Sequence, residues 1–496
     1  MQRSRALFLL AGLTWLTTVS FEATAQELVQ DIDPGLPDSS PGAFVDVGST
    51  LVFTASTGTH GRELWRSDGT GTLLIKDINP GDSSSFPFRP TRVGDAVFFG
   101  ASTDTHGTEL WKSDGTTEGT VLVRDISPGS DSSLSTAFPP FTGIGDVLFF
   151  SASDGTNGRE LWRSDGTLEG TVLIKDINPG SNHGLPSGAL VDVGGTLFFS
   201  ADDGTNGREL WKSDGTAEGT VLVKNINAGG AHSDPRGFVN VDGTLFFSAT
   251  NGTSVDDLFM SDGRSGIELW KSDGTEEGTV LVKDINPGSA DSLPSELVNF
   301  GGTLFFNAES ATNGRELWRS DGTAEGTVLV EDINPGFSSS FASGLVAFGG
   351  DLFFTANDGT HGFELWRSDG TEEGTVLVED ISSGPSSSAP TLLTPLGDEL
   401  FFTAGEAATG FELWRSDGTA EGTVLAGDIR PGESGSSILE IAVAGDTLFF
   451  SANDGVSGTE LWALTPITTI PAMSEWALIL LSLTLGLLGY RFLVRT

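Results

Sequence analysis

The chain has 496 residues and a formal net charge of −42, because 68 acidic residues stand against 26 basic ones. A surface this acidic repels phosphate backbones, which excludes nucleic acid as a partner. The chain has no cysteine, which excludes disulfides, thiolate metal ligands and cysteine nucleophiles. Its 33 Phe and 11 Trp are nevertheless enough to build a folded core.

Residues 1–25 have the parts of a secretory signal peptide. Basic residues precede the apolar run Ala6–Val19, and Ala23 and Ala25 form an A-x-A cleavage site. We expect cleavage after Ala25, which leaves a mature chain that begins at Gln26. A buried helix is the alternative for this segment.

A Glu-Leu-Trp repeat fills residues 26–464, and its last four intervals are each 48 residues long. A period of this size indicates a propeller or a solenoid rather than ordinary domains. We interpret the repeated tryptophan as a core residue packed between neighbouring sheets, with sugar stacking as the alternative. These tryptophans are Trp65, Trp111, Trp162, Trp211, Trp270, Trp318, Trp366, Trp414 and Trp462.

Each repeat predicts four short strands. In one unit they are Leu345–Phe348, Leu352–Ala356, Phe363–Ser368 and Val376–Ile381, separated by Gly-Gly, Asn-Asp-Gly and Asp-Gly. Apolar and β-branched runs between such turn residues are typical of antiparallel strands. Four strands per unit make one propeller blade, so the fold class is all-β.

The two ends of the array complete each other. The last unit stops after Trp462 without its fourth strand, and Leu28–Ile32 has the sequence of that missing strand. We therefore predict nine four-stranded blades, closed into one ring by the N-terminal strand, which removes two sheet edges. An open solenoid would need capping units, and two smaller propellers would need a linker that the array lacks.

The Asp-Gly-Thr sequence occurs in two loops per repeat, as at Asp154 and Asp165. Such loops are turns in one interpretation and calcium sites in the other, because calcium prefers oxygen ligands. No other cofactor is predicted. Alternation places Glu160 and Trp162 on one strand face, so we expect the glutamate to pair with a Lys or Arg of a neighbouring blade.

No catalytic constellation is visible. The only tyrosine, Tyr490, follows the repeats, which excludes a tyrosine nucleophile, and no carboxylate pair is marked out. The histidines are spread over different units. One unit carries an insertion, Asn251–Gly266, of the kind that repeat proteins place on a binding face or tolerate as surface expansion. The five histidines are His60, His106, His183, His232 and His361.

The C-terminus reads as a linker and motif over 465–475, then a hydrophobic anchor helix and basic tail over 476–496. The stretch Trp476–Val494 is nearly long enough to span a bilayer. The segment resembles the IPTL-CTERM sorting signal of Gram-negative bacteria, and the matching residues are Ile470, Pro471, Ser474, Glu475 and Trp476. That resemblance implies processing by an exosortase-like enzyme, and an exported protein at the cell envelope or surface, anchored or released after processing.

The string Glu160–Thr167 resembles the ELWxxDGT repeat of bacterial exported proteins, and this resemblance covers essentially the whole mature chain. It implies no established activity. From these features we expect a non-enzymatic, envelope-anchored scaffold for binding or adhesion to protein or glycan. The alternatives are a carbohydrate-active enzyme that uses carboxylates in the propeller channel, and a structural matrix or envelope protein.

Overall fold

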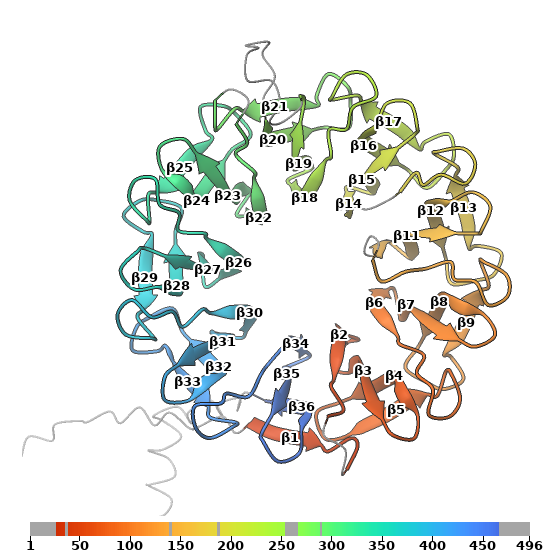
Figure 1. Cartoon of the computed structure of the whole chain (residues 1–496), viewed down its shortest axis with the longest axis horizontal. Helices are drawn as coiled ribbons and strands as arrows, with labels where there is room; N and C mark the ends of the chain where they lie inside the picture. Colours follow the sequence, from red (N-terminus) through yellow and green to blue (C-terminus); the bar gives the residue numbers. More distant parts are fainter. Residues whose placement is uncertain are drawn as a thin grey trace, which may run out of the picture. The chain divides into compact units, whose positions relative to one another are not determined.

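The computed structural model describes residues 26–34, 38–137, 141–185, 189–252, 266–287 and 290–465. In these ranges the regular elements are strands, which form nine antiparallel four-stranded sheets around a ring (Figure 1). The prediction of an all-β, nine-bladed propeller is confirmed. The predicted C-terminal helix lies outside the described residues. No helix in the described ranges is long and apolar enough to cross a bilayer.

Each blade runs from an inner strand at the ring centre to an outer strand at the rim (Figure 1). The inner strands are β2 (Gly42–Asp46), β6 (Phe88–Val93), β10 (Thr142–Ile144), β14 (Leu190–Val193), β18 (Arg236–Val241), β22 (Ser295–Phe300), β26 (Ser343–Phe348), β30 (Thr391–Leu396) and β34 (Ile441–Ala444). The second strands are β3 (Leu51–Thr57), β7 (Ala96–Thr103), β11 (Val147–Ser153), β15 (Thr196–Asp202), β19 (Thr244–Thr250), β23 (Thr303–Ser310), β27 (Asp351–Asn357), β31 (Glu399–Glu406) and β35 (Thr447–Asn453).

The third strands carry the Glu-Leu-Trp sequence. They are β4 (Gly61–Ser67), β8 (Gly107–Ser113), β12 (Arg159–Ser164), β16 (Arg208–Ser213), β20 (Ile267–Ser272), β24 (Gly314–Ser320), β28 (Phe363–Ser368), β32 (Gly410–Ser416) and β36 (Thr459–Leu464). The outer strands are β5 (Thr72–Lys76), β9 (Val121–Arg124), β13 (Val172–Lys175), β17 (Val221–Lys224), β21 (Val280–Lys283), β25 (Val328–Glu331), β29 (Val376–Glu379), β33 (Val424–Gly427) and β1 (Gln26–Gln30). We number the blades 1 to 9 from β2 to β34.

Blade 9 is completed by the N-terminal strand, as predicted. Strand β1 pairs antiparallel with β36, with Gln26 opposite Leu464. It also holds both neighbouring blades: the Gln26 side chain donates to the Ala426 carbonyl at 2.6 Å, and Gln30 accepts the Thr72 N–H at 3.2 Å. The closing strand therefore joins blades 8, 9 and 1.

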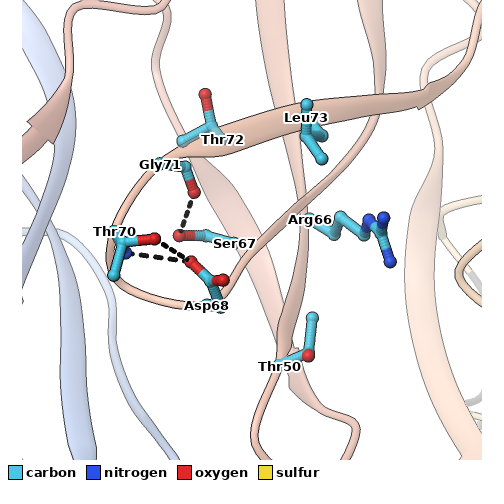
Figure 2. A pocket seen from close by; sticks show the side chains of 8 residues that line it. All are labelled: Thr50, Arg66, Ser67, Asp68, Thr70, Gly71, Thr72 and Leu73. Carbon is cyan, nitrogen blue, oxygen red and sulfur yellow. Dashed lines mark hydrogen bonds between the residues drawn. The ribbon is translucent and has the colours of Figure 1, made fainter.

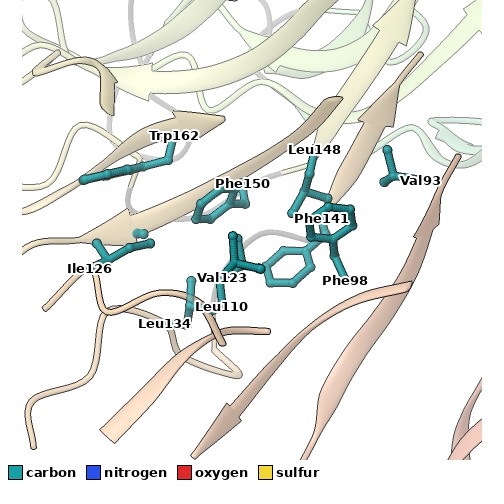
Figure 3. Packing of buried hydrophobic residues seen from close by; sticks show 11 residues of the cluster. Val93, Phe98, Leu110, Val123, Ile126, Leu134, Phe141, Leu148, Phe150 and Trp162 are labelled. Atoms are coloured by element: carbon teal, nitrogen blue, oxygen red, sulfur yellow. The ribbon is translucent and has the colours of Figure 1, made fainter. Parts of the chain in front are cut away.

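The hydrophobic core lies between the blades. In Figure 3, Phe98 and Val123 of blade 2 pack against Phe150 and Trp162 of blade 3. Clusters of the same composition occupy all nine seams of the described ring. Phe150 is fully buried, and burial of such a side chain stabilises the fold by about 1.5–3 kcal/mol. Each blade thus depends on its neighbours, which is the physical reason for a closed ring.

The ring has two faces. We call connection face the side with the loops between second and third strands and the segments that join one blade to the next, such as residues 332–342. We call turn face the side with the turns between first and second strands and the Ser-Asp-Gly-Thr loops, such as residues 368–375.

Candidate functional site

The glutamate of each Glu-Leu-Trp sequence is fully buried and binds backbone rather than a basic side chain. Glu160 accepts the Ile177 N–H at 2.9 Å and the Gly184 N–H at 2.7 Å. Elsewhere a serine hydroxyl is a further donor, as from Ser133 to Glu109 at 2.6 Å. The expected ion pair with a neighbouring blade is therefore wrong. The carboxylate instead fastens the segment after the outer strand to the third strand of its own blade.

Burial changes the acidity of these carboxyls. Loss of hydration raises the pKa from 4.5 to about 7, against the opposing effect of the hydrogen bonds. Because these side chains have no exposed surface, they are structural groups and do not contact a substrate. The five glutamates are Glu109, Glu160, Glu209, Glu268 and Glu316.

The Asp-Gly-Thr loops of the connection face are turns that the aspartate organises. The Asp154 carboxylate accepts the N–H groups of Thr156 and Asn157, each at 2.8 Å, and the Asn157 side-chain amide at 2.8 Å. In blade 7 a histidine stands at the asparagine position, where His361 Nδ1 lies 2.7 Å from Asp358. This hydrogen bond raises the pKa of His361.

In the loops of the turn face, the aspartate likewise accepts hydrogen bonds from its own loop. Asp165 Oδ1 accepts the Thr167 N–H at 2.9 Å and its hydroxyl at 2.7 Å, which lowers the pKa of the carboxyl. No group of three or more His, Asp or Glu able to hold a metal lies in the described ranges. The calcium hypothesis itself stays untested.

We expect the thermal unfolding midpoint of the full-length chain to be the same with calcium and with a chelator. The reason is that backbone and threonine donors already occupy Oδ1 of these aspartates, and a ligand raises the midpoint only if it binds the folded state. Differential scanning fluorimetry of the two samples measures this. A calcium-dependent rise would contradict the turn interpretation and support metal sites.

The repeated tryptophans lie in the seams. Those of blades 1 to 8 are 4–8% exposed, and Trp462 is half-buried. A basic side chain of the preceding blade lies over some of the rings: Arg124 is 5.8 Å from the ring centre of Trp162, and Lys283 is 6.0 Å from that of Trp318. No described surface presents these rings as a stacking platform for a sugar.

The ring is asymmetric in its basic residues. In blades 1 to 5 the last residue of the outer strand is Lys or Arg, and it donates to a threonine carbonyl of the next blade, as from Lys76 to Thr120 at 2.7 Å. In blades 6, 7 and 8 that position holds Glu331, Glu379 and Gly427. This hydrogen bond between neighbouring blades is therefore confined to blades 1 to 6, one arc of the ring.

A second position changes over the same arc. The residue before the Glu-Leu-Trp sequence is Arg62, Arg159, Arg208 and Arg315 in blades 1, 3, 4 and 6, and Arg315 donates to the Leu293 carbonyl at 3.1 Å. In blades 7 and 8 this residue is phenylalanine. An alignment of the repeats shows the change from arginine to phenylalanine. Only the structure shows that this position lies on the connection face. The two residues are Phe363 and Phe411.

Exposed apolar side chains gather on the connection face of this arc, from the segment entering blade 7 to blade 9. Phe337 is 85% exposed, Leu439 is 77% exposed and Val456 is 90% exposed. The other members are Phe341, Leu392 and Phe411, and we call the six residues together the apolar arc. From 332 to 465 the only Lys or Arg residues are Arg367, Arg415 and Arg430, beside one histidine, His361, so the apolar arc lies in a strongly acidic region.

Blade 1 carries a hollow of about 350 Å³ on the turn face (Figure 2). Its walls come from neighbouring strands, because Val52 is paired with Arg66, and Arg66 with Leu73. The Asp68–Thr72 turn on its edge is two residues shorter than in the other units. The lining residues are Thr50, Arg66, Ser67, Asp68, Thr70, Gly71, Thr72 and Leu73.

The histidines are not brought together. His60, His106 and His361 lie in loops of blades 1, 2 and 7, while His183 and His232 accept the N–H groups of Arg159 and Arg208. Ala23, Ala25, the five motif residues Ile470 to Trp476, and most of the insertion Asn251–Gly266 lie outside the described residues.

Residues 468–495 match the model of the IPTL-CTERM motif. This confirms the resemblance of the tail and is consistent with an exported, surface-associated protein. The match covers only the tail. No curated relative matches the chain.

Among solved structures the chain is similar to a puromycin hydrolase, with 16% identity and a TM-score of 0.39, over 74% of this chain and 59% of that one. It is also similar to a structure from a study of two prolyl endopeptidases, with 11% identity and a TM-score of 0.40, over 74% and 54%. The chain thus spans little more than half the length of these neighbours.

These neighbours correct the functional expectation. They are a puromycin hydrolase and a prolyl endopeptidase, and they give no support to the expected non-enzymatic scaffold for adhesion to protein or glycan. They give no support either to its alternatives, a carbohydrate-active enzyme and a structural matrix or envelope protein. The likeness is one of fold, and no activity passes from those proteins to this chain.

Proposed function

We propose that this protein is an exported, envelope-held propeller that handles peptides, and that it receives cationic segments with apolar side chains at the apolar arc as substrates. The observation that carries the proposal is the gathering of six exposed apolar side chains, among them Phe411 in place of an arginine, in an acidic region. Large exposed apolar surface marks binding sites, and a negative field draws cationic ligands toward it.

The proposal includes the chain ends. A signal peptide over 1–25, cleaved after Ala25, would direct export, and the helix over 476–496 would hold the propeller in the membrane of a Gram-negative envelope. An exosortase-like enzyme would process the motif at 465–475 and either anchor or release residues 26–464. The ELWxxDGT resemblance of the repeat, as at Glu160–Thr167, is part of the same proposal.

The test uses two labelled peptides added to the full-length chain, one of repeated Lys-Leu-Gly and one of repeated Glu-Leu-Gly. We expect the lysine peptide to bind and the glutamate peptide not to bind, in fluorescence anisotropy. Salt should weaken binding, because it screens the acidic surface. Mass spectrometry of the same samples shows whether the bound peptide is cleaved.

The matched variants put back the residue that other blades carry. We expect Phe411→Arg, the arc member at this position, to weaken binding of the lysine peptide by about tenfold or more, because apolar contact is lost and a positive charge is gained. The control is Thr108→Arg, at the same position in blade 2, which should leave affinity unchanged. Equal binding of both peptides, or equal effects of both variants, would overturn the proposal.

A further inference from the structure

The hollow of blade 1 lies beside a position where the side chain is smaller than in most blades, because Val52 is paired with the lining residue Arg66. In other blades a phenylalanine of the second strand covers a turn glycine of the next blade: a Cβ built on Gly166 would lie 3.1 Å from the Phe98 ring, and one on Gly322 3.1 Å from Phe246. Blade 1 has Val52 at this position, and a Cβ on Gly115 would have no neighbour within 4 Å. The Gly115 turn of blade 2 therefore lacks the aromatic cover that the turns of the following blades have.

Two of the residues at the position of Arg66 in other blades donate to a turn carbonyl of the next blade. Lys212 donates to the Gly274 carbonyl at 2.8 Å, and Lys271 donates to the Gly322 carbonyl at 2.7 Å. Among the described residues, no hydrogen bond or ion pair is formed by the Arg66 side chain, which is exposed and lines the hollow. Its guanidinium group is thus available to a carboxylate, its best-matched partner.

The hollow is also lined by a carboxylate, that of Asp68, and by an apolar side chain, that of Leu73. Asp68 uses Oδ1 for the Thr70 N–H at 3.0 Å and the Thr70 hydroxyl at 2.7 Å, and Oδ2 takes no part in these bonds (Figure 2). Leu73 is 59% exposed beside Arg66. A cation, an anion and an apolar side chain line one small cavity.

We propose that this hollow binds a free α-amino acid with an apolar side chain. Its carboxylate would meet Arg66, its ammonium group would meet Asp68, and its side chain would contact Leu73. A zwitterion has no net charge, so the charge of −42 does not oppose its approach as it would oppose an anion. The volume of about 350 Å³ is of the size that small-molecule sites have. This proposal does not depend on the peptide-handling function.

The test compares leucine with N-acetylleucine and leucinamide, which lack the ammonium group and the carboxylate, by isothermal titration calorimetry on the full-length chain. We expect leucine to bind, and each analogue to bind about tenfold more weakly or not at all, because each loses one charge-assisted hydrogen bond. Lack of leucine binding would overturn the proposal. So would an analogue that binds as well as leucine.

Variants locate the binding. Arg66→Gln and Asp68→Asn should each weaken leucine binding by about tenfold, and asparagine keeps the Oδ1 acceptor that the turn needs. The control Arg319→Gln, at the same position in blade 6, should have no effect, because Phe305 fills that seam. Val52→Phe introduces the residue of the other blades and should abolish binding without lowering the unfolding midpoint. Binding that survives Val52→Phe would place the ligand elsewhere and contradict the proposal.

Discussion

Deletion of residues 26–33 is expected to lower the free energy of unfolding by roughly 3–6 kcal/mol or to prevent folding. The loss comes from the burial of Ile32, worth about 1.5–3 kcal/mol, with a smaller part from the partly buried Val29. The deletion also removes the Ile32 N–H that binds the buried Glu460 at 3.0 Å, and it exposes the edge of β36. Denaturant unfolding of the two chains measures the difference.

A permuted chain is the control for this deletion. Because Gln26 lies opposite Leu464, residues 26–40 can be placed after Leu464 through a short glycine-rich turn, and the chain then begins at Pro41. We expect this variant to regain most of the lost stability, since the same strand completes blade 9. A deletion chain as stable as the natural one, or a permuted chain as unstable as the deletion, would show that the closing strand is not what holds the ring.

Stability is expected to be higher at pH 5 than at pH 8. The pKa of the five glutamates is about 7 in the folded chain and 4.5 without burial, so the folded state holds their protons more tightly. Their contribution is greatest below pH 4.5 and is lost as the pH rises from 4.5 through 7, by up to about 3 kcal/mol for each carboxyl. Urea unfolding at a series of pH values measures this decline.

The turn aspartates act in the opposite direction at lower pH. Hydrogen bonds from threonine lower the pKa of Asp114, Asp165, Asp214 and Asp273 below 3.8, so their contribution is present above that pH and is lost as the pH falls further. Together the two groups of carboxyls place the stability maximum between pH 3.8 and pH 4.5. A stability that is flat between pH 5 and pH 8 would contradict the role given to the buried glutamates.

The Glu316→Gln variant distinguishes the contribution of a buried glutamate to the pH dependence of stability from the contribution of the exposed acidic residues. The amide keeps one acceptor for the N–H groups of Ile333 and Ser340 but cannot bind or release a proton. We expect lower stability than the natural chain at pH 5, and a pH slope reduced by up to one proton, about 1.4 kcal/mol per pH unit. The matched control is Glu325→Gln, an exposed glutamate of the same blade, which should leave the slope unchanged.

Much of the fold follows from local sequence. The strands of blade 7 lie within one or two residues of their predicted bounds, because apolar runs and turn residues determine where a strand begins and ends. The outer strand ends at Glu379 rather than at Ile381, because the Ile381 N–H binds Glu364 instead of a neighbouring strand. Ring closure was also predictable, since the missing strand of blade 9 is visible at Leu28–Ile32.

The period, the four-stranded unit, the number of blades and the tail motif can be derived from the amino-acid sequence, because these depend on patterns within one repeat or one segment. The tertiary structure decided what the polar residues do. It placed Glu160 against backbone N–H groups rather than a basic side chain, left Arg66 facing a hollow beside Val52, and gathered Phe337 and Leu439 on one face. Such roles depend on which residues of adjacent blades come into contact in a seam or on a face. Only the closed ring determines those contacts.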